Sequence, residues 1–204
     1  MHLNGLIQKQ GYPKKEYRLV LLPHEELRQR IMNIKKQFSK DYQSHSALWG
    51  GPYITLATFW QLERAEEHIL RNLKVLSMGF PPFKVALKDF GSFPTHTIYF
   101  HVETKIPIKR LVHQIRSLNK LLLPDRDHPP YFRETPYIPV ATKLLPWQYQ
   151  QGWNQFSHRH FTGSFIASSM LLLCRKRSER NFQVLERFDF LNLPVAARQG
   201  QLFD

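Results

Sequence analysis

Residues 51–59 read Gly-Pro-Tyr-Ile-Thr-Leu-Ala-Thr-Phe, and residues 135–143 read Thr-Pro-Tyr-Ile-Pro-Val-Ala-Thr-Lys. The Pro-Tyr-Ile triplet, the Ala-Thr pair and the spacing between them are the same in both stretches. Each stretch is typical of a β-strand, in which tyrosine is a favoured residue. A strand used twice in one chain indicates a duplicated architecture, and we expect a cleft between its two halves.

Strand geometry predicts which side chains of each copy could face such a cleft. Alternate residues of a strand share one face. In the first copy this rule groups Thr58 with Ile54 and Leu56 on a face that we expect to be core. The opposite face carries the tyrosine of each copy and its alternate neighbours: Tyr53, Thr55, Ala57, Tyr137, Pro139 and Ala141.

Further helices and strands are expected around the two copies. After Pro23, the apolar residues Leu27, Ile31 and Phe38 recur at a spacing that gives a helix one apolar face. Similar patterns predict helices over 62–76, from Pro107 onward and over 147–159, and strands over 16–22, 83–90, 96–103, 164–175 and 181–190. This order favours two α+β lobes of about a hundred residues each over a parallel doubly wound sheet.

The ends of the chain differ in composition from its centre. Residues 1–15 combine three lysines with Gly11 and Pro13, which predicts a flexible basic lead. Residues 16–190 are expected to form a single bilobal domain, and residues 191–204 a C-terminal tail.

Composition limits the class of protein and of partner. The chain has 204 residues, of which 42% are apolar, and this is enough for one domain with a real core. The formal net charge of +13 favours a polyanionic partner such as RNA, although a generally basic protein with a solvated cationic surface is the alternative. Cys174 is the single cysteine, so no internal disulfide can form and we expect a reducing, cytoplasmic compartment. We also expect a monomer. We expect no membrane association, because no apolar run approaches the ~20 residues that a spanning helix needs.

At the repeated stretches the chain resembles the two-histidine (2H) phosphoesterase superfamily, the bacterial RNA 2',3'-cyclic phosphodiesterases long called 2'-5' RNA ligases. That family carries a His-x-Thr/Ser motif on each of two strands, usually within Pro-His-Ile-Thr-Leu-Ala. This chain has Pro-Tyr-Ile-Thr-Leu-Ala and Pro-Tyr-Ile-Pro-Val-Ala. The resemblance covers most of residues 16–190 and implies a bilobal α+β fold, with antiparallel sheets that flank a central cleft and helices outside.

The resemblance also identifies what the motifs lack. It implies that one histidine acts as general base and the other as general acid across a cyclic phosphate, while motif hydroxyls hold the phosphate oxygens. Tyr53 and Tyr137 stand at the histidine positions, and Pro139 stands at the second hydroxyl position. Imidazole titrates near ~6.5, whereas a phenol titrates near ~10. Losing one proton-transfer partner typically costs ~10²–10⁴ in rate. We therefore expect a pseudoenzyme that binds a nucleotide, an RNA end or another phosphate ligand with little or no catalysis.

Two groups of candidate binding residues follow. Ligand contacts in the cleft are expected from Tyr53, Thr55, Tyr137, Arg133 and Lys143. A hairpin loop near residues 175–180 is expected to supply nucleic-acid contacts through its cations: Arg175, Lys176, Arg177 and Arg180. The partner is then RNA or a small phosphate compound. We expect no cofactor, and no metal, since no histidine pair has metal-ligand spacing together with a nearby cysteine or carboxylate.

Three alternatives remain open from the sequence. The tyrosines could be strand aromatics that simply fill the cleft. The chain could be an active, diverged phosphodiesterase or ligase that uses its tyrosines or histidines recruited from elsewhere: His24, His45 or His128. It could also be a non-catalytic basic domain that binds RNA or protein. The literal His-x-Thr at residues 160–162 lies outside the repeat, and we interpret it as coincidental.

Overall fold

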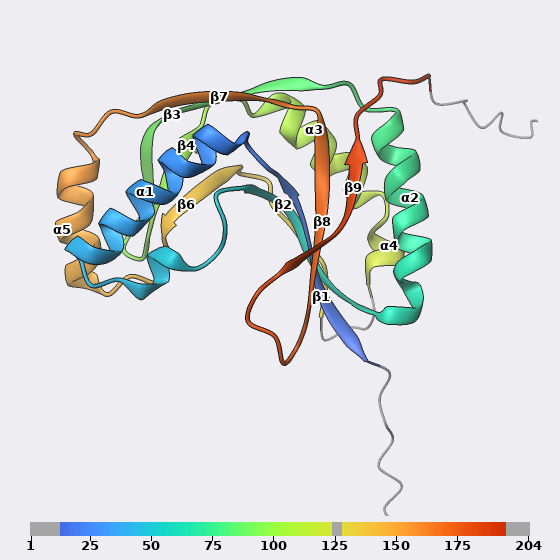
Figure 1. The fold of residues 1–204 in the computed structure, drawn as a ribbon, viewed down its shortest axis with the longest axis horizontal. Helices are drawn as coiled ribbons and strands as arrows, with labels where there is room; N and C mark the ends of the chain where they lie inside the picture. Colours follow the sequence, from blue (N-terminus) through green and yellow to red (C-terminus); the bar gives the residue numbers. More distant parts are fainter. Residues whose placement is uncertain (1–12, 124–127, 195–204) are drawn as a thin grey trace, which may run out of the picture.

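Two antiparallel sheets form the frame of the protein in the computed structural model, which describes residues 13–123 and 128–194 (Figure 1). The first sheet has the order β5 (Tyr131–Phe132), β2 (Ile54–Leu62), β1 (Lys14–Leu21), β8 (Ser169–Lys176) and β9 (Gln183–Asp189). The second has the order β6 (Tyr137–Ala141), β4 (Thr97–Val102), β3 (Phe83–Phe93) and β7 (Thr162–Ala167).

Each sheet is covered by its own helices. α2 (Glu66–Met78), α3 (Ile106–Arg116) and α4 (Asn119–Leu122) pack on the first sheet, whereas α1 (Glu25–Asp41) and α5 (Pro146–Phe156) pack on the second. Short 3-10 turns, η1 (His45–Leu48) and η2 (Glu63–Ala65), precede β2 and α2. Figure 1 shows α1 and α5 at one side of the molecule and α2 and α4 at the other. The expected α+β fold with flanking sheets and outer helices is confirmed.

α1 shows how the sequence produces this packing. His24 caps the helix, since its Nδ1 accepts a hydrogen bond from the backbone N–H of Leu27. Leu27, Ile31 and Phe38 are fully buried, as their helical spacing predicts. Burying each such side chain contributes about 1.5–3 kcal/mol.

The two lobes are not the two halves of the chain, contrary to the expected division. The first sheet joins strands from both ends of the chain, because β1 pairs along β8. The single strand expected over 164–175 is two strands, β7 and β8, separated by Ser168. β7 pairs with β3 and β8 pairs with β1, so the chain crosses from one sheet to the other at this residue.

The expected flexible ends fall mainly outside the described residues, which exclude 1–12 and 195–204. Lys14 and Lys15, expected in the basic lead, belong to β1, because they pair with Leu62 and Gln61 of β2. No helix in the described ranges 13–123 and 128–194 has the length and apolar character needed to cross a membrane.

A β-bulge interrupts β2 within the first copy of the repeat. Leu19 of β1 pairs with Ala57, and the next residue, Val20, pairs with Thr55. Leu56 is therefore an extra residue, which reverses the alternation of side chains beyond it. Thr58 consequently shares the face of Tyr53, and Ala57 is buried. This corrects the expectation that Ala57 faces the cleft and Thr58 the core.

The second copy contains the same bulge. Ile98 of β4 pairs with Ala141 of β6, and Tyr99 pairs with Pro139, so Val140 is the extra residue. Ala141 is buried for the same reason as Ala57. The repeat is thus a duplication of backbone geometry as well as of sequence.

Candidate functional site

A cleft of about 840 Å³ lies between the two sheets. Both copies of the repeat contribute to its lining, together with the loop before β2 and the hairpin between β8 and β9. The lining residues are Arg18, Leu48–Gly51, Tyr53, Thr55, Thr58, Arg133, Tyr137, Pro139, Thr142, Lys143, Arg175 and Glu179–Phe182.

All motif positions of the two copies meet at this cleft. Tyr53 and Thr55 line it from the first copy, and Tyr137 and Pro139 line it from the second. The bulges add one further hydroxyl from each copy, on Thr58 and Thr142. Strict alternation missed these two threonines, although the repeated Ala-Thr pair was a signal for them.

Tyr53 is held by a glycine and an arginine. Arg18 Nη1 donates a 3.0 Å hydrogen bond to the Tyr53 hydroxyl. The tyrosine ring lies directly on Gly51, where an added Cβ would come within 2.4 Å of ring atom Cε1. Arg18 pairs in register with Thr58, so both side chains lie on the cleft face of the sheet. The sequence signal that could have identified this arginine is the alternation of the charged Glu16 and Arg18 with Tyr17 and Leu19.

Tyr137 is held by other aromatic rings and by Arg133. Its ring centroid lies 5.2 Å from that of Phe93 and 5.0 Å from that of Tyr99. Arg133 stacks its guanidinium on the outer side, with Cζ 4.2 Å from the Tyr137 centroid. Burial raises the pKa of Tyr99, and Tyr137 adds to this effect. The tyrosine ring is therefore packed in place, while it still lines the cleft.

Arg133 is fixed by its backbone while its side-chain donors stay unused. The Arg133 N–H donates to the Leu56 carbonyl over 2.9 Å, which anchors it at the edge of β2. Among the described residues its guanidinium makes ring contacts, to Tyr137 and Tyr131, but no hydrogen bond or ion pair. Its Nε is buried without a partner, as is the Nε of Arg18. Such donors retain their capacity for an anionic acceptor.

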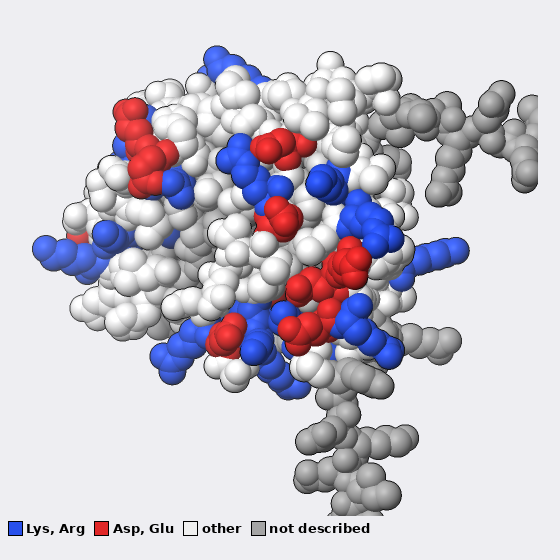
Figure 2. Space-filling model, turned by 45° about the vertical axis from the view of Figure 1, so that its right-hand side comes forward, with Lys and Arg blue, Asp and Glu red and all other residues white. Residues whose placement is uncertain are grey.

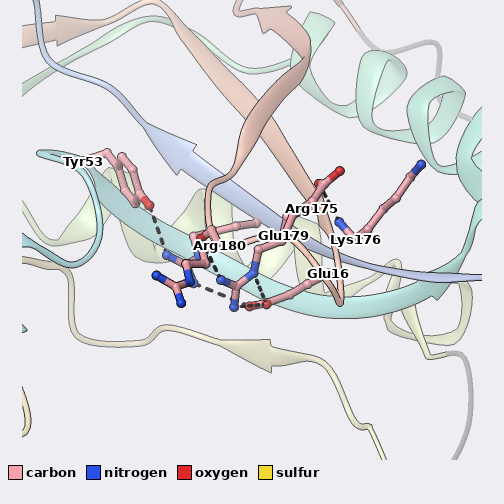
Figure 3. Close-up of polar contacts among 7 residues, drawn as sticks. Glu16, Tyr53, Arg175, Lys176, Glu179 and Arg180 are labelled. Atoms are coloured by element: carbon pink, nitrogen blue, oxygen red, sulfur yellow. Dashed lines mark hydrogen bonds and ion pairs between the residues drawn. The ribbon is translucent and has the colours of Figure 1, made fainter.

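A buried carboxylate organises the opposite wall (Figure 3). Glu16 accepts a 2.7 Å hydrogen bond from Arg175 Nε and lies 3.5 Å from Arg18 Nη2. Phe182 lies between the two guanidinium groups, with its centroid 4.3 Å from Arg18 Cζ and 4.6 Å from Arg175 Cζ. These contacts fix two arginine side chains before any ligand binds.

The four cations predicted on the hairpin separate into two pairs. Arg175 and Arg180 line the cleft, and Arg175 Nη1 donates to the backbone carbonyl of Arg180. Lys176 and Arg177 do not line it, and Figure 3 shows Lys176 directed away from Arg175 and Arg180. The hairpin itself was predicted correctly, but its cations face two different surroundings.

No histidine lines the cleft within ranges 13–123 and 128–194. His24 caps α1, His45 is exposed in η1, and His128 contacts the ring of Trp60. His160 lies on the exterior, with Nδ1 3.3 Å from Asp89. The recruitment of His24, His45 or His128, which the sequence left open, is therefore not supported by their positions.

Positive charge dominates the cleft. Five cationic side chains line it, against one lining carboxylate, Glu179. This local excess differs from the face that carries α2, where acidic and basic side chains are interspersed (Figure 2). Lys143 contributes through its left-handed backbone, φ 52°, which lets it line the cleft directly after Thr142. No group of three or more potential metal ligands occurs in the described part of the chain.

A buried lysine lies beneath the second copy. Lys35 of α1 is fully buried, and its Nζ donates a 2.8 Å hydrogen bond to the Pro139 carbonyl. Burial lowers the Lys35 pKa to about 8. The backbone of the second motif is thus tied to α1 at the residue that lacks a side-chain hydroxyl.

The comparisons with known proteins agree with this geometry. Residues 23–179 match the family model of the 2'-5' RNA ligase superfamily. Crystal structures of Escherichia coli LigT are similar: the apo form has a TM-score of 0.61 at 14% identity, and the 3'-AMP complex 0.58 at 15%. A Thermus thermophilus protein gives 0.53 at 17%. Each alignment covers 87% of this chain and 98% of the other. LigT has also been crystallised with phosphate, NADP+ and ATP. No curated protein sequence matches the chain.

Proposed function

The chain belongs to the 2'-5' RNA ligase superfamily, and on that premise we propose that its cleft binds a nucleotide, an RNA end or another phosphate ligand with little or no turnover. One observation carries the proposal: the Arg133 guanidinium, which has no hydrogen-bond or ion-pair partner among the described residues, lines a cleft whose two motif positions hold phenols. The cation supports binding of an anion, and the phenols argue against acid–base catalysis at neutral pH.

Three features support ligand binding. The phenols and the hydroxyls of Thr55, Thr58 and Thr142 can donate to phosphate oxygens. Arg18 and Arg133 line the cleft as cations, and the Nε of each has no hydrogen-bond partner among the described residues. The structurally similar LigT binds phosphate and 3'-AMP in crystals.

Weak or absent turnover follows from the chemistry of the residues in the cleft. A phenol would need its pKa lowered by about three units to act as a base near pH 7, which requires about 4 kcal/mol of differential stabilisation. Pro139 offers no side-chain donor where a hydroxyl is expected. We interpret the tyrosines as occupants of the family's histidine positions. The proposed compartment is the cytoplasm, because the single cysteine can form no internal disulfide.

The decisive experiment measures binding and turnover on the same preparation. Calorimetry with 3'-AMP and 2',3'-cyclic AMP reports affinity, and a hydrolysis assay at high protein concentration reports turnover. We expect binding without hydrolysis. A hydrolysis rate that disappears in the Tyr53→Phe/Tyr137→Phe variant would overturn the claim of inactivity and establish a tyrosine-dependent enzyme.

A second pair of variants tests whether the cleft is the binding site. Thr58→Val/Thr142→Val removes two cleft hydroxyls with almost no change of shape, whereas Lys176→Ala/Arg177→Ala alters cations outside the cleft. We expect the first pair to weaken nucleotide binding. Unchanged affinity in the threonine variant, with RNA binding lost in the hairpin variant, would instead identify a basic interaction domain.

A further inference from the structure

We propose that the cleft recognises two separate phosphate groups carried by one ribose, rather than a single phosphate. This inference rests on the proposed function, because it specifies the ligand of the same cleft. Two phosphates that flank one ribose occur in a nucleoside 3',5'-bisphosphate and at each internal nucleotide of an RNA strand. Both place two phosphate groups across one ribose, as monoesters in the bisphosphate and as diesters in the RNA strand.

The charge of the cleft exceeds what one phosphate can neutralise. Arg18 and Arg175 share the carboxylate of Glu16, and Glu179 accepts a hydrogen bond from the Lys176 backbone N–H. Arg18, Arg133, Lys143, Arg175 and Arg180, set against these two carboxylates, leave an excess of three positive charges. A phosphate monoester carries about −1.5 to −2 near pH 7, and a cyclic diester carries −1. Two monoesters balance the excess, whereas one monoester, or the two diesters of an RNA strand, leave at least about one positive charge uncompensated.

The proposal assigns the two phosphates to two arginines of the cleft. Arg18 is bonded to the Tyr53 hydroxyl, which precedes β2 in the first sheet. Arg133 stacks on Tyr137, the first residue of β6 in the second sheet. Each guanidinium has a buried Nε with no partner among the described residues, so each lacks one acceptor.

Each point has its own hydroxyl at an equivalent position. Thr58 and Thr142 follow the same bulge in β2 and β6 and line the cleft from opposite sheets. An arginine, a tyrosine and a threonine therefore meet the ligand at both points. A volume of about 840 Å³ also leaves room for a ribose between them.

The test compares adenine nucleotides that differ in phosphate number and position. Affinities of the full chain are measured by calorimetry for 3'-AMP, 5'-AMP, ADP and adenosine 3',5'-bisphosphate. ADP controls for two phosphates that are joined. We expect the bisphosphate to bind at least tenfold more tightly than each of the other three. ApApA identifies the source: equal or tighter binding than the bisphosphate indicates an RNA strand, and weaker binding indicates the free nucleotide.

Two arginine variants separate the points. Arg18→Met and Arg133→Met should each abolish the higher affinity for the bisphosphate. One variant should lower the affinity for 3'-AMP, and the other should lower the affinity for 5'-AMP. Thermal denaturation checks that each variant is folded. If a methionine variant unfolds, Arg18→Lys or Arg133→Lys replaces it in the same comparison. Lys84→Met, an exposed change on β3, is the matched control for loss of one charge.

Each remaining outcome overturns the proposal. A bisphosphate that binds no better than 3'-AMP or ADP leaves the proposed nucleotide binding intact but removes the second phosphate point. Equal weakening of the same monophosphate by both arginine variants indicates one shared point. If no nucleotide binds, the proposed function fails along with this inference.

Discussion

Arg18 and Tyr53 form a hydrogen bond across the first sheet, with Nη1 3.0 Å from the phenol oxygen. The bond joins β1 to the residue just before β2, and it directs the phenol toward the cationic wall of the cleft (Figure 3). Arg18 is itself fixed by Glu16 and Phe182. The position of Tyr53 therefore depends on three residues that are remote from it in the sequence.

Removing the phenol oxygen should weaken both folding and ligand binding. Tyr53→Phe deletes one partly exposed hydrogen bond, so we expect the free energy of unfolding to fall by about 0.5–1.5 kcal/mol. Loss of a donor to a charged phosphate should lower nucleotide affinity roughly tenfold. Urea denaturation and calorimetry measure the two effects. Wild-type affinity in this variant would contradict a ligand contact by Tyr53.

The glycine pair before β2 offers a matched steric test. In Gly51→Ala the new Cβ would lie 2.4 Å from Tyr53 Cε1, so the ring must move from its position. Gly50 has φ 71° and open space around it. Gly50→Asn introduces a residue that tolerates this left-handed backbone conformation. We expect nucleotide affinity to fall severalfold in Gly51→Ala and to fall less in Gly50→Asn, which adds a side chain to the cleft lining without displacing the ring. Equal affinities would show that the ring position does not matter.

Salt dependence should report which cations contact RNA. Three lining cations, Arg133, Lys143 and Arg180, have no carboxylate partner among the described residues. Neutralising three phosphates of a single strand gives a slope of roughly −2 for log affinity against log salt concentration. A slope near about −3.5 would mean that Lys176 and Arg177 also participate. Fluorescence anisotropy with a labelled oligonucleotide measures the slope.

The repeated stretch allowed much of this site to be predicted. The two repeated strands predicted that Tyr53 and Tyr137 face one cleft, and both residues line it. Strict alternation could not locate Thr58 and Thr142, because one extra residue in each strand reverses the order of the side chains. The crossing at Ser168 was equally hidden, since a continuous strand pattern does not reveal where a chain changes sheets.

The contacts of Arg133 could not be predicted from the neighbouring sequence, for a different reason. Arg133 follows a two-residue strand, β5, whose pairing with β2 joins residues far apart in the chain. Its stacking on Tyr137 depends on that pairing, and nothing in the adjacent sequence specifies it. Sequence alone indicated a cation near the second motif, and tertiary structure determined what it contacts.

Overpacking should outweigh helix propensity at Gly152 in α5. Alanine gains about 1 kcal/mol over glycine in a helix interior. A Cβ here would lie 2.8 Å from Phe38 Cε2, inside a buried aromatic cluster, and overpacking typically costs about 1–3 kcal/mol. We expect Gly152→Ala to lower the free energy of unfolding by up to ~2 kcal/mol, while exposed Gln151→Ala changes it by less than ~0.5 kcal/mol. A stabilised Gly152→Ala would mean that Phe38 repacks at little cost.

Lys35 should make stability rise with pH above neutrality. Its pKa is about 8 in the folded protein, against 10.5 as its ordinary value. Below pH 8 the amine is charged in both states, so its burial penalty is constant. Between pH 8 and 10.5 the unfolded chain binds more protons, and the free energy of unfolding therefore increases, by on the order of 3 kcal/mol in total.

Lys35→Met isolates this contribution. Burial and Glu66 raise the pKa of Tyr17, and that effect lowers stability above pH 10 in both proteins, so it cancels in their difference. We expect wild type to gain stability relative to Lys35→Met as the pH rises from 7.5 to about 9.5, followed by urea denaturation. Parallel stability curves would mean that Lys35 keeps its ordinary affinity for a proton. The hydrogen bond to Pro139 would then hold a charged amine beneath the second motif at alkaline pH as well as below pH 8.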